Sequence, residues 1–258
     1  RAALAQYLRF MYVPAPRSIH PGLYKLEPGT ILTVNGSLPP VPPKVPVRPG
    51  ETYGSLSIHR YWSLTADIEA GARDPIRDQG EAIAGLEKVL SAAVKRQMIS
   101  DVPLGAFLSG GVDSSTIVAL MQAQSDRPVQ TFTIGFDAAA FDESPHAAAV
   151  AHHLGTKHTN LRVTDADALK VIPNLPELYD EPFADSSQIP MHLVCRVARQ
   201  NVVVALSGDG GDELFGGYNR YFWGPRIWDR LAILPYPLRQ GLGSIIRAVP
   251  VPVWYAAG

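Results

Sequence analysis

The feature that most constrains the fold is a glycine turn between an apolar run and a run of helical composition. The apolar run is 102–108, the turn is Ser109-Gly-Gly111, and a helix is predicted over 114–124. A strand that turns tightly into a helix gathers free backbone N–H groups around one point, and the helix N-terminus is partially positive. Gly110 and Gly111 lack the Cβ atoms that would keep a phosphate away from the backbone. The sequence therefore predicts an anion site directly after this strand.

Strand-like and helical runs alternate along the chain after this turn. The predicted strands are 102–108, 129–135, 157–163 and 202–206, and the predicted helices between them are 114–124, 142–154, 164–172 and 189–200. This order predicts an α/β fold, with a parallel sheet and helices on both faces. The last strand is β-branched enough to be buried on both faces. Ligands of such sheets bind beyond the carboxyl ends of the strands, so we expect the loops after Leu108, Gly135 and Leu206 to face one cleft.

The N-terminal part is predicted to be small and rich in β-structure. A short helix over 2–9 precedes a hairpin formed by 22–26 and 30–34. Proline-dense residues 37–50 form an extended linker or an exposed excursion, because proline lacks the N–H that helices and sheets need. A short strand is expected within 53–64. Asp74-Pro75 then opens a long helix, whose apolar face is predicted to pack on the parallel sheet. That face consists of Ile83, Leu86, Leu90 and Val94.

Composition excludes several classes of protein. The formal net charge of −1 gives no basic field for nucleic acid or an anionic membrane. No apolar run approaches the roughly 20 residues that cross a bilayer. Cys195 is the one cysteine in 258 residues, so no intrachain disulfide can form, which favours a cytoplasmic location. We expect Cys195 to be a buried, inert thiol. His146, His152, His153 and His158 have no metal-binding spacing and are expected on the surface.

Carboxylates accompany the predicted anion site. Asp113 lies within the first loop, and the loop Ser207–Tyr218 adds Asp209, Asp212 and Glu213. Acids beside a phosphate repel it unless a hard cation bridges the two, and two carboxylates with phosphate oxygens suit Mg²⁺. The alternatives are a plain tight connection for the first loop and an acidic turn that caps the next helix for the second.

A third loop, Tyr179–Ser187, crowds acids and hydroxyls before a helix. Asp185, Ser186 or Ser187 is either the N-cap of that helix or, with Asp180, part of a pocket for an acceptor molecule. A weaker candidate, 142–144, is interpreted as a helix start rich in capping residues.

At these loops the sequence resembles a known family. Ser109-Gly-Gly-Val-Asp-Ser114 is similar to the pyrophosphate loop of N-type ATP pyrophosphatases (PP-loop enzymes). Together with 207–218 and 180–187 it resembles the synthetase domain of glutamine-hydrolysing asparagine synthetases. Other pyrophosphatases share the first loop but not the second. The resemblance implies an adenine nucleotide α-hydrolase-like fold over 65–258, truncated at the C-terminus. It also implies that 1–64 is the end of a class II glutaminase domain and its connector.

The resemblance also assigns roles to single residues. Asp113 and Asp212 would bind Mg²⁺, and Asp209 falls where the family has an acid important for adenylate formation. The acceptor would lie against Asp180, Asp185, Ser186 and Ser187. The ATP and pyrophosphate contacts would be Phe107, Leu108, Ser109, Gly110, Gly111, Asp113, Ser114, Ile134, Ser207 and Gly208.

The implied reaction is ATP-dependent amide formation. A carboxylate, aspartate in the first interpretation, attacks ATP to give an acyl-adenylate and pyrophosphate, and glutamine-derived ammonia then displaces AMP. The chain lacks the family's N-terminal Cys nucleophile, a later catalytic Lys is not visible, and 183–187 lacks the Arg of some aspartate-specific members. Another carboxylate acceptor, of the peptide or β-lactam type, therefore stays open as the substrate. A non-catalytic nucleotide-binding relative is the alternative to an enzyme. The protein is also open to being a homodimer. A glutaminase domain on the same parent chain would supply the ammonia.

Overall fold

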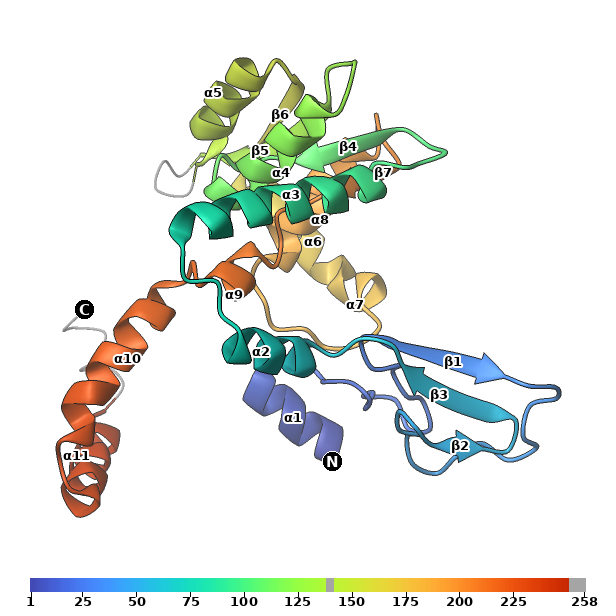
Figure 1. Cartoon of the computed structure of the whole chain (residues 1–258), viewed down its shortest axis with the longest axis vertical. Coiled ribbons are helices and arrows are strands. Elements are labelled where there is room, and N and C mark those ends of the chain that lie inside the picture. The colour runs from blue at the N-terminus through green and yellow to red at the C-terminus, as the bar shows by residue number, and fades with distance from the viewer. Residues whose placement is uncertain (138–141, 251–258) are drawn as a thin grey trace.

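The computed structural model describes residues 1–137 and 142–250 and contains two β-sheets (Figure 1). A small antiparallel sheet belongs to the N-terminal part of the chain, and a four-stranded parallel sheet belongs to the part after residue 100. The end of the predicted domain at residue 258 lies outside the described residues.

The N-terminal part begins with helix α1 (Ala2–Phe10), as predicted. Its sheet has the order β1 (Thr30–Val34), β3 (Leu56–Arg60), β2 (Thr52–Tyr53), and β3 pairs antiparallel with both neighbours. The predicted hairpin is wrong in its partner, because Gly22–Leu26 forms only an isolated bridge from Tyr24. The pattern of apolar residues identified the strand at 30–34 but not the strand with which it pairs.

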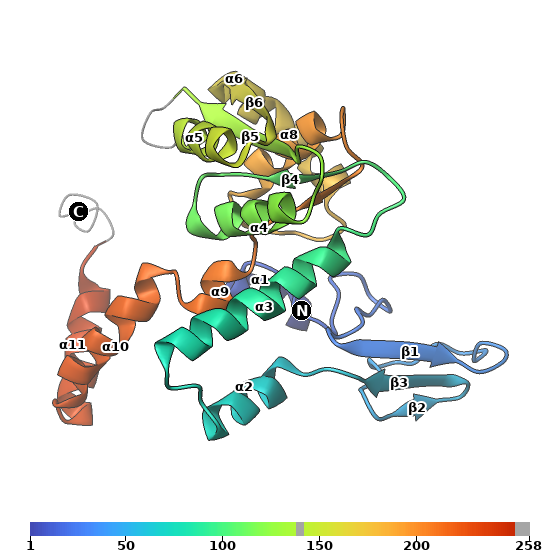
Figure 2. The same cartoon turned by 45° about the horizontal axis from the view of Figure 1, so that its top comes forward.

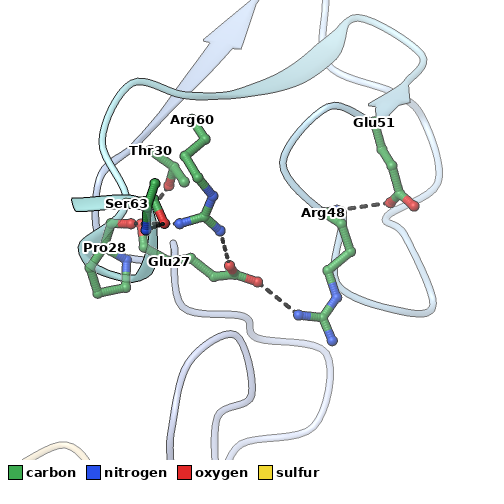
Figure 3. Close-up of polar contacts among 8 residues, drawn as sticks. Glu27, Pro28, Thr30, Arg48, Glu51, Arg60 and Ser63 are labelled. Atoms are coloured by element: carbon green, nitrogen blue, oxygen red, sulfur yellow. Dashed lines mark hydrogen bonds and ion pairs between the residues drawn. The ribbon is translucent and has the colours of Figure 1, made fainter. Parts of the chain in front are cut away.

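The proline-dense residues 37–50 lie between β1 and β2 and therefore form an excursion from one sheet. An ion-pair cluster joins this excursion to β3 (Figure 3). The carboxylate of Glu27 accepts from Arg48 Nη1 at 2.7 Å and also binds Arg60. Burial raises the pKa of Glu27, but hydrogen bonds from the two guanidinium groups outweigh it and leave that pKa below its usual range.

Two helices connect the sheets. Helix α2 (Leu64–Arg73), capped by the Ser63 hydroxyl, was not predicted. Helix α3 (Gln79–Gln97) begins later than the predicted Asp74-Pro75, because Asp78 Oδ1 accepts from Glu81 N at 2.8 Å and is the N-cap. The predicted apolar face packs only in part. Val94 is buried, whereas Ile83 is 58% and Leu86 43% exposed.

The parallel sheet confirms the predicted fold class. Its order is β6 (Lys157–Val163), β5 (Gln130–Phe136), β4 (Leu104–Phe107), β7 (Val204–Leu206), and all neighbours are parallel. The chain moves outward from β4 to β5 and β6 and then returns to the other side of β4. The direction of winding thus reverses between β4 and β7, which is the position where such sheets bind ligands.

Helices cover both faces of this sheet, as predicted (Figures 1 and 2). Helices α4 (Val112–Ala123) and α5 (Ser144–Leu154) pack with α3 on one face, around Ala106, Leu108 and Met121. On the other face, Phe132 and Val163 pack against the helices that follow β6. These helices are α6 (Asp165–Val171) and α8 (Gln188–Ala198). A 3₁₀ turn (Ile172–Asn174) and the short α7 (Leu175–Leu178) connect them.

Strand β7 is an edge strand among the described residues, so its predicted burial on both faces is wrong. Val203 and Val204 are 48% and 41% exposed. Helices α9 (Gly211–Phe215), α10 (Asn219–Ala232) and α11 (Tyr236–Ala248) follow β7. In both views α10 and α11 stand away from the parallel sheet (Figures 1 and 2), and neither has a buried residue.

The cysteine and one histidine differ from expectation. Cys195 is exposed, because α8 buries Leu193, Val194, Val197 and Ala198 and turns position 195 away from them. His158 lies inside, where its Nδ1 is 2.9 Å from Thr131 Oγ1 and burial lowers its pKa. Among the described residues, none of the helices has the length and apolar character needed to cross a bilayer.

Candidate functional site

The two glycine-rich loops leave neighbouring strands at the same end of the sheet. The loop Ser109–Ser114 follows β4, and the loop Ser207–Tyr218 follows β7. Since parallel strands end at one edge, both loops reach the position where the winding reverses. This shared edge of the parallel strands is the reason to expect that the two loops face one cleft.

The first loop is stabilised by its own serines. Ser109 Oγ and Ser114 Oγ hydrogen-bond at 2.9 Å, and Gly111 N donates to Ser109 Oγ at 3.2 Å. Gly110 has φ +85°, and an added Cβ would lie 2.7 Å from the backbone nitrogen of Ala147 in α5. Only glycine therefore fits this turn, for reasons of conformation and of space. Helix α4 then starts without a side-chain cap, so no capping side chain satisfies the amides of its first turn.

Contacts of two glycines show how closely the loops approach. A Cβ on Gly208 would lie 2.7 Å from Ser114 N and 2.9 Å from Asp113 C. A Cβ on Gly211 would lie 2.3 Å from Asp113 Oδ2. The backbone of the second loop therefore rests directly against the first turn of α4 and against the carboxylate of Asp113.

Two acids of the second loop, Asp209 and Asp212, have different surroundings. Asp212 Oδ1 lies so close to the backbone of Gly217 that a Cβ there would be 1.9 Å away. Asp209 is exposed, and its amide donates to Ser207 Oγ at 3.2 Å. Among the ion pairs of residues 1–137 and 142–250, none includes Asp113, Asp209 or Asp212. These three carboxylates are therefore free of internal cations, unlike Glu181 and Glu27.

Glu213 has a structural partner. Its Oε1 accepts from the Tyr218 hydroxyl at 2.6 Å, which closes the second loop. This hydrogen bond raises the pKa of Tyr218 to about 12 and lowers the pKa of Glu213. That Asp209, Asp212 and Glu213 share a cleft with Asp113 stays a prediction. No group of three or more His, Cys, Asp or Glu side chains able to hold a metal occurs in the described part of the chain.

A cavity of about 240 Å³ brings together several of the residues predicted to contact ATP. Phe107, Leu108 and Ile134 line it, with Ser109 from the first loop and Ser187 from the third. Its apolar wall thus continues into the glycine turn that would hold phosphates. An apolar pocket beside an anion turn matches the two halves of a nucleotide, the base and the phosphates.

The third loop is built by local and distant hydrogen bonds. Asp185 Oδ1 accepts from Ser187 N at 2.8 Å, which lowers the pKa of Asp185 and supports its role as a turn former before α8. The main-chain oxygen of Asp180 lies 2.7 Å from His20 Nε2. Ser186 and Ser187 are exposed, and Ser187 alone of the four predicted acceptor residues lines the 240 Å³ cavity.

The weak candidate at 142–144 has the role of a helix start. Asp142 Oδ1 accepts from the amide and the hydroxyl of Ser144 at 3.1 and 2.6 Å, and α5 begins at Ser144. These hydrogen bonds lower the pKa of Asp142.

A family model described as asparagine synthase matches residues 85–252, which is more than half of the chain. The chain belongs to the asparagine synthase family. The matched region contains all three loops, and it begins within α3.

Named relatives agree with this assignment. The chain is 37% identical over 238 residues to putative asparagine synthetase (glutamine-hydrolyzing) 2 of Methanocaldococcus jannaschii, covering 92% of this chain and 42% of that protein. It is 34% identical to a putative asparagine synthetase (glutamine-hydrolyzing) of Mycobacterium bovis over 96% of this chain and 35% of that protein. It is 32% identical to asparagine synthetase (glutamine-hydrolyzing) 1 of Bacillus subtilis over 86% of this chain and 31% of that protein. The chain thus spans well under half the length of these relatives.

In this asparagine synthase family member, a second cavity lies away from the glycine loops. It measures about 670 Å³ and is lined by residues of the N-terminal segment 12–25 and of the third loop at 179–183. Lys25 and Glu181 line it, and neither was among the predicted site residues. Because the two are 156 positions apart, no local spacing in the sequence could indicate their contact.

Proposed function

We propose that this chain is the adenylating part of an ATP-dependent amide-forming ligase of the asparagine synthetase type. The acceptor would be a carboxylate, most directly aspartate, and the nitrogen would be ammonia released from glutamine by a glutaminase domain of the same protein. The single observation that carries this proposal is the contact of Gly208 and Gly211 with the first turn of α4. It sets the backbone of the second loop against the carboxylate of Asp113 and against the helix start that would bind an anion.

The proposed reaction has two steps. An oxygen of the acceptor carboxylate attacks the α-phosphorus of ATP, the bond to the β-phosphate breaks, and pyrophosphate leaves. The nitrogen of ammonia then attacks the activated carbonyl carbon, and AMP leaves with the bonding electrons. Transfer through a charged transition state requires fixed donors more than a protein nucleophile.

Each part of the site has a proposed role in these steps. Phe107, Leu108 and Ile134 hold the adenosine in the apolar cavity. The turn Ser109–Gly111 and the amides and hydroxyl at Ser114 bind the departing pyrophosphate, with the backbone of Ser207 and Gly208 beside the nucleotide. Asp209, exposed at the cleft edge, assists adenylate formation.

Asp113 and Asp212 are the residues that would hold Mg²⁺. The residues fit such an ion in their chemistry, because both are carboxylates and neither forms an ion pair among the described residues. When bound, Mg²⁺ would offset the charge of the phosphate oxygens.

The composition of the third loop leaves room for an acceptor other than aspartate. Residues 180–187 carry no basic side chain to pair with the second carboxylate of aspartate. A larger carboxylic acid of the peptide or β-lactam type is therefore the alternative substrate, activated by the same two steps.

Pyrophosphate exchange into ATP tests this function. In the full-length protein, Asp113→Asn is expected to abolish exchange that depends on Mg²⁺ and acceptor, and a set of carboxylic acids is screened for AMP release with ammonia. The matched control is Asp101→Asn. Asp101 is exposed and precedes the start of β4, away from the glycine turn that follows the strand, so this variant is expected to leave exchange unchanged. Undiminished exchange in Asp113→Asn would overturn the proposed function.

A further inference from the structure

The third loop is joined to the N-terminal segment by one partly buried carboxylate. Glu181 Oε1 accepts from the amide of Ile19 at 2.6 Å, and Oε2 forms an ion pair with Lys25 Nζ. Lys25 Nζ also donates to the main-chain oxygen of Val13. The Glu181 side chain is 18% exposed and that of Lys25 is 37% exposed, so solvent screens this ion pair in part.

Two further hydrogen bonds join the same segments. His20 Nε2 lies 2.7 Å from the main-chain oxygen of Asp180, and the amide of Ala184 donates to the main-chain oxygen of Met11 at 2.9 Å. Residues 180–184 are therefore held at three points by residues 11–25, which precede them by more than 150 positions. The opposite end of the loop, Ser187, borders the 240 Å³ cavity and begins α8.

The charges make Glu181 the central member of this contact. Burial raises the pKa of Glu181, but hydrogen bonds from Lys25, Ile19 and Ser18 outweigh it, and the pKa lies below its usual range. The carboxylate is thus charged at neutral pH and depends on Lys25 for compensation. Removing one partner leaves the other partly buried and unpaired, which is the costly way to break an ion pair.

We propose that Glu181 and Lys25 are positioning residues, through which the N-terminal segment sets the place of the acceptor loop relative to the nucleotide cavity. This inference rests on the proposed function for its kinetic consequence. Within residues 1–137 and 142–250, neither Glu181 nor Lys25 lines the 240 Å³ cavity or hydrogen-bonds to the glycine turn, so nucleotide binding is expected to be independent of the pair. Binding of the acceptor depends on it, because residues 180–187 carry every side chain assigned to the acceptor.

Hydrogen exchange tests the positioning directly, without any acceptor. In the full-length protein with Lys25→Met, the amides of 180–188 are expected to exchange at least tenfold faster, whereas those of 109–115 keep their wild-type rates. Glu181→Gln preserves shape and is the second variant. Lys25→Arg keeps a positive donor for Glu181 and for the main-chain oxygen of Val13. The exchange rates of amides 180–188 in this variant are expected to stay within threefold of wild type. Lys170→Met breaks a surface pair with Asp167 and is the matched control.

Steady-state kinetics with L-aspartate and ammonia test the consequence. Lys25→Met is expected to raise the KM for L-aspartate at least tenfold, while the KM for ATP stays within twofold. Unchanged exchange at 180–188, or an equal rise in both KM values, would overturn the positioning role. Absence of AMP release by the wild-type protein with every acid screened would instead overturn the proposed function, and the exchange experiment would still decide the positioning.

Discussion

Replacing Gly208 with alanine is expected to separate the two loops of the proposed nucleotide site. The added Cβ would lie 2.7 Å from Ser114 N and 2.9 Å from Asp113 C. Both are backbone atoms, so neither can turn away as a flexible side chain could. The second loop must move instead, and with it Asp209, Gly211 and Asp212.

The size of this movement follows from the contacts. Ordinary contact of a Cβ begins at 3.4 Å, so the backbone atoms must separate by about 0.7 Å. Forcing an extra methyl group into packed backbone costs about 1–3 kcal/mol. Catalytic groups must stay within about 0.5 Å of their productive geometry. We therefore expect pyrophosphate exchange to fall about 100-fold, since misplacement by about 1 Å has that effect.

The assay combines exchange kinetics with thermal unfolding of the full-length protein. Gly85→Ala is the matched control, because a Cβ there meets no heavy atom within 4 Å and glycine lies inside helix α3. That control is expected to keep full activity and to gain about 0.5–1 kcal/mol of stability. An exchange rate for Gly208→Ala within threefold of wild type would refute the contact between the loops.

Two further predictions concern stability. Thr164→Ala removes the capping box of α6, in which Asp167 N donates to Thr164 Oγ1 at 3.2 Å, and is expected to cost about 1 kcal/mol, whereas Thr164→Ser keeps the hydroxyl and most of the stability. Glu27→Gln weakens the pairs with Arg48 and Arg60 and is expected to cost about 1 kcal/mol at pH 7. Because the folded pKa of Glu27 is lowered, this contribution is present above the unfolded pKa of about 4.3 and is lost as pH falls through the folded value. Urea unfolding of the wild-type protein and of Glu27→Gln at pH 7 and at acidic pH measures the difference in their free energies of unfolding. A difference that does not shrink at acidic pH would contradict the role given to the charge of Glu27.

Local patterns predicted the parallel sheet well. The strand 157–163 agrees at both ends, since it is bounded by Gly155 and by the capping residue Thr164. The loops after β4 and β7 could be placed together because parallel strands end at one edge.

Long-range partners could not be predicted in the same way. β1 pairs with β3 across a proline-dense excursion, so the nearer run 22–26 was the natural but wrong partner. β7 has the composition of a central strand, yet its place in the sheet order decides its exposure. The role of Glu181 gave no local signal, because its partner Lys25 lies in another part of the chain, although Glu181 itself belongs to the third loop.

The central claim is that the loops after β4 and β7 form one nucleotide site. A crystal structure of the full-length protein with α,β-methylene-ATP and Mg²⁺ tests it most directly. We predict the phosphates on the turn Ser109–Ser114, with the metal between Asp113 and Asp212 and the base against Phe107 and Ile134 in the 240 Å³ cavity. Nucleotide bound instead in the 670 Å³ cavity beside residues 12–25 would contradict the account.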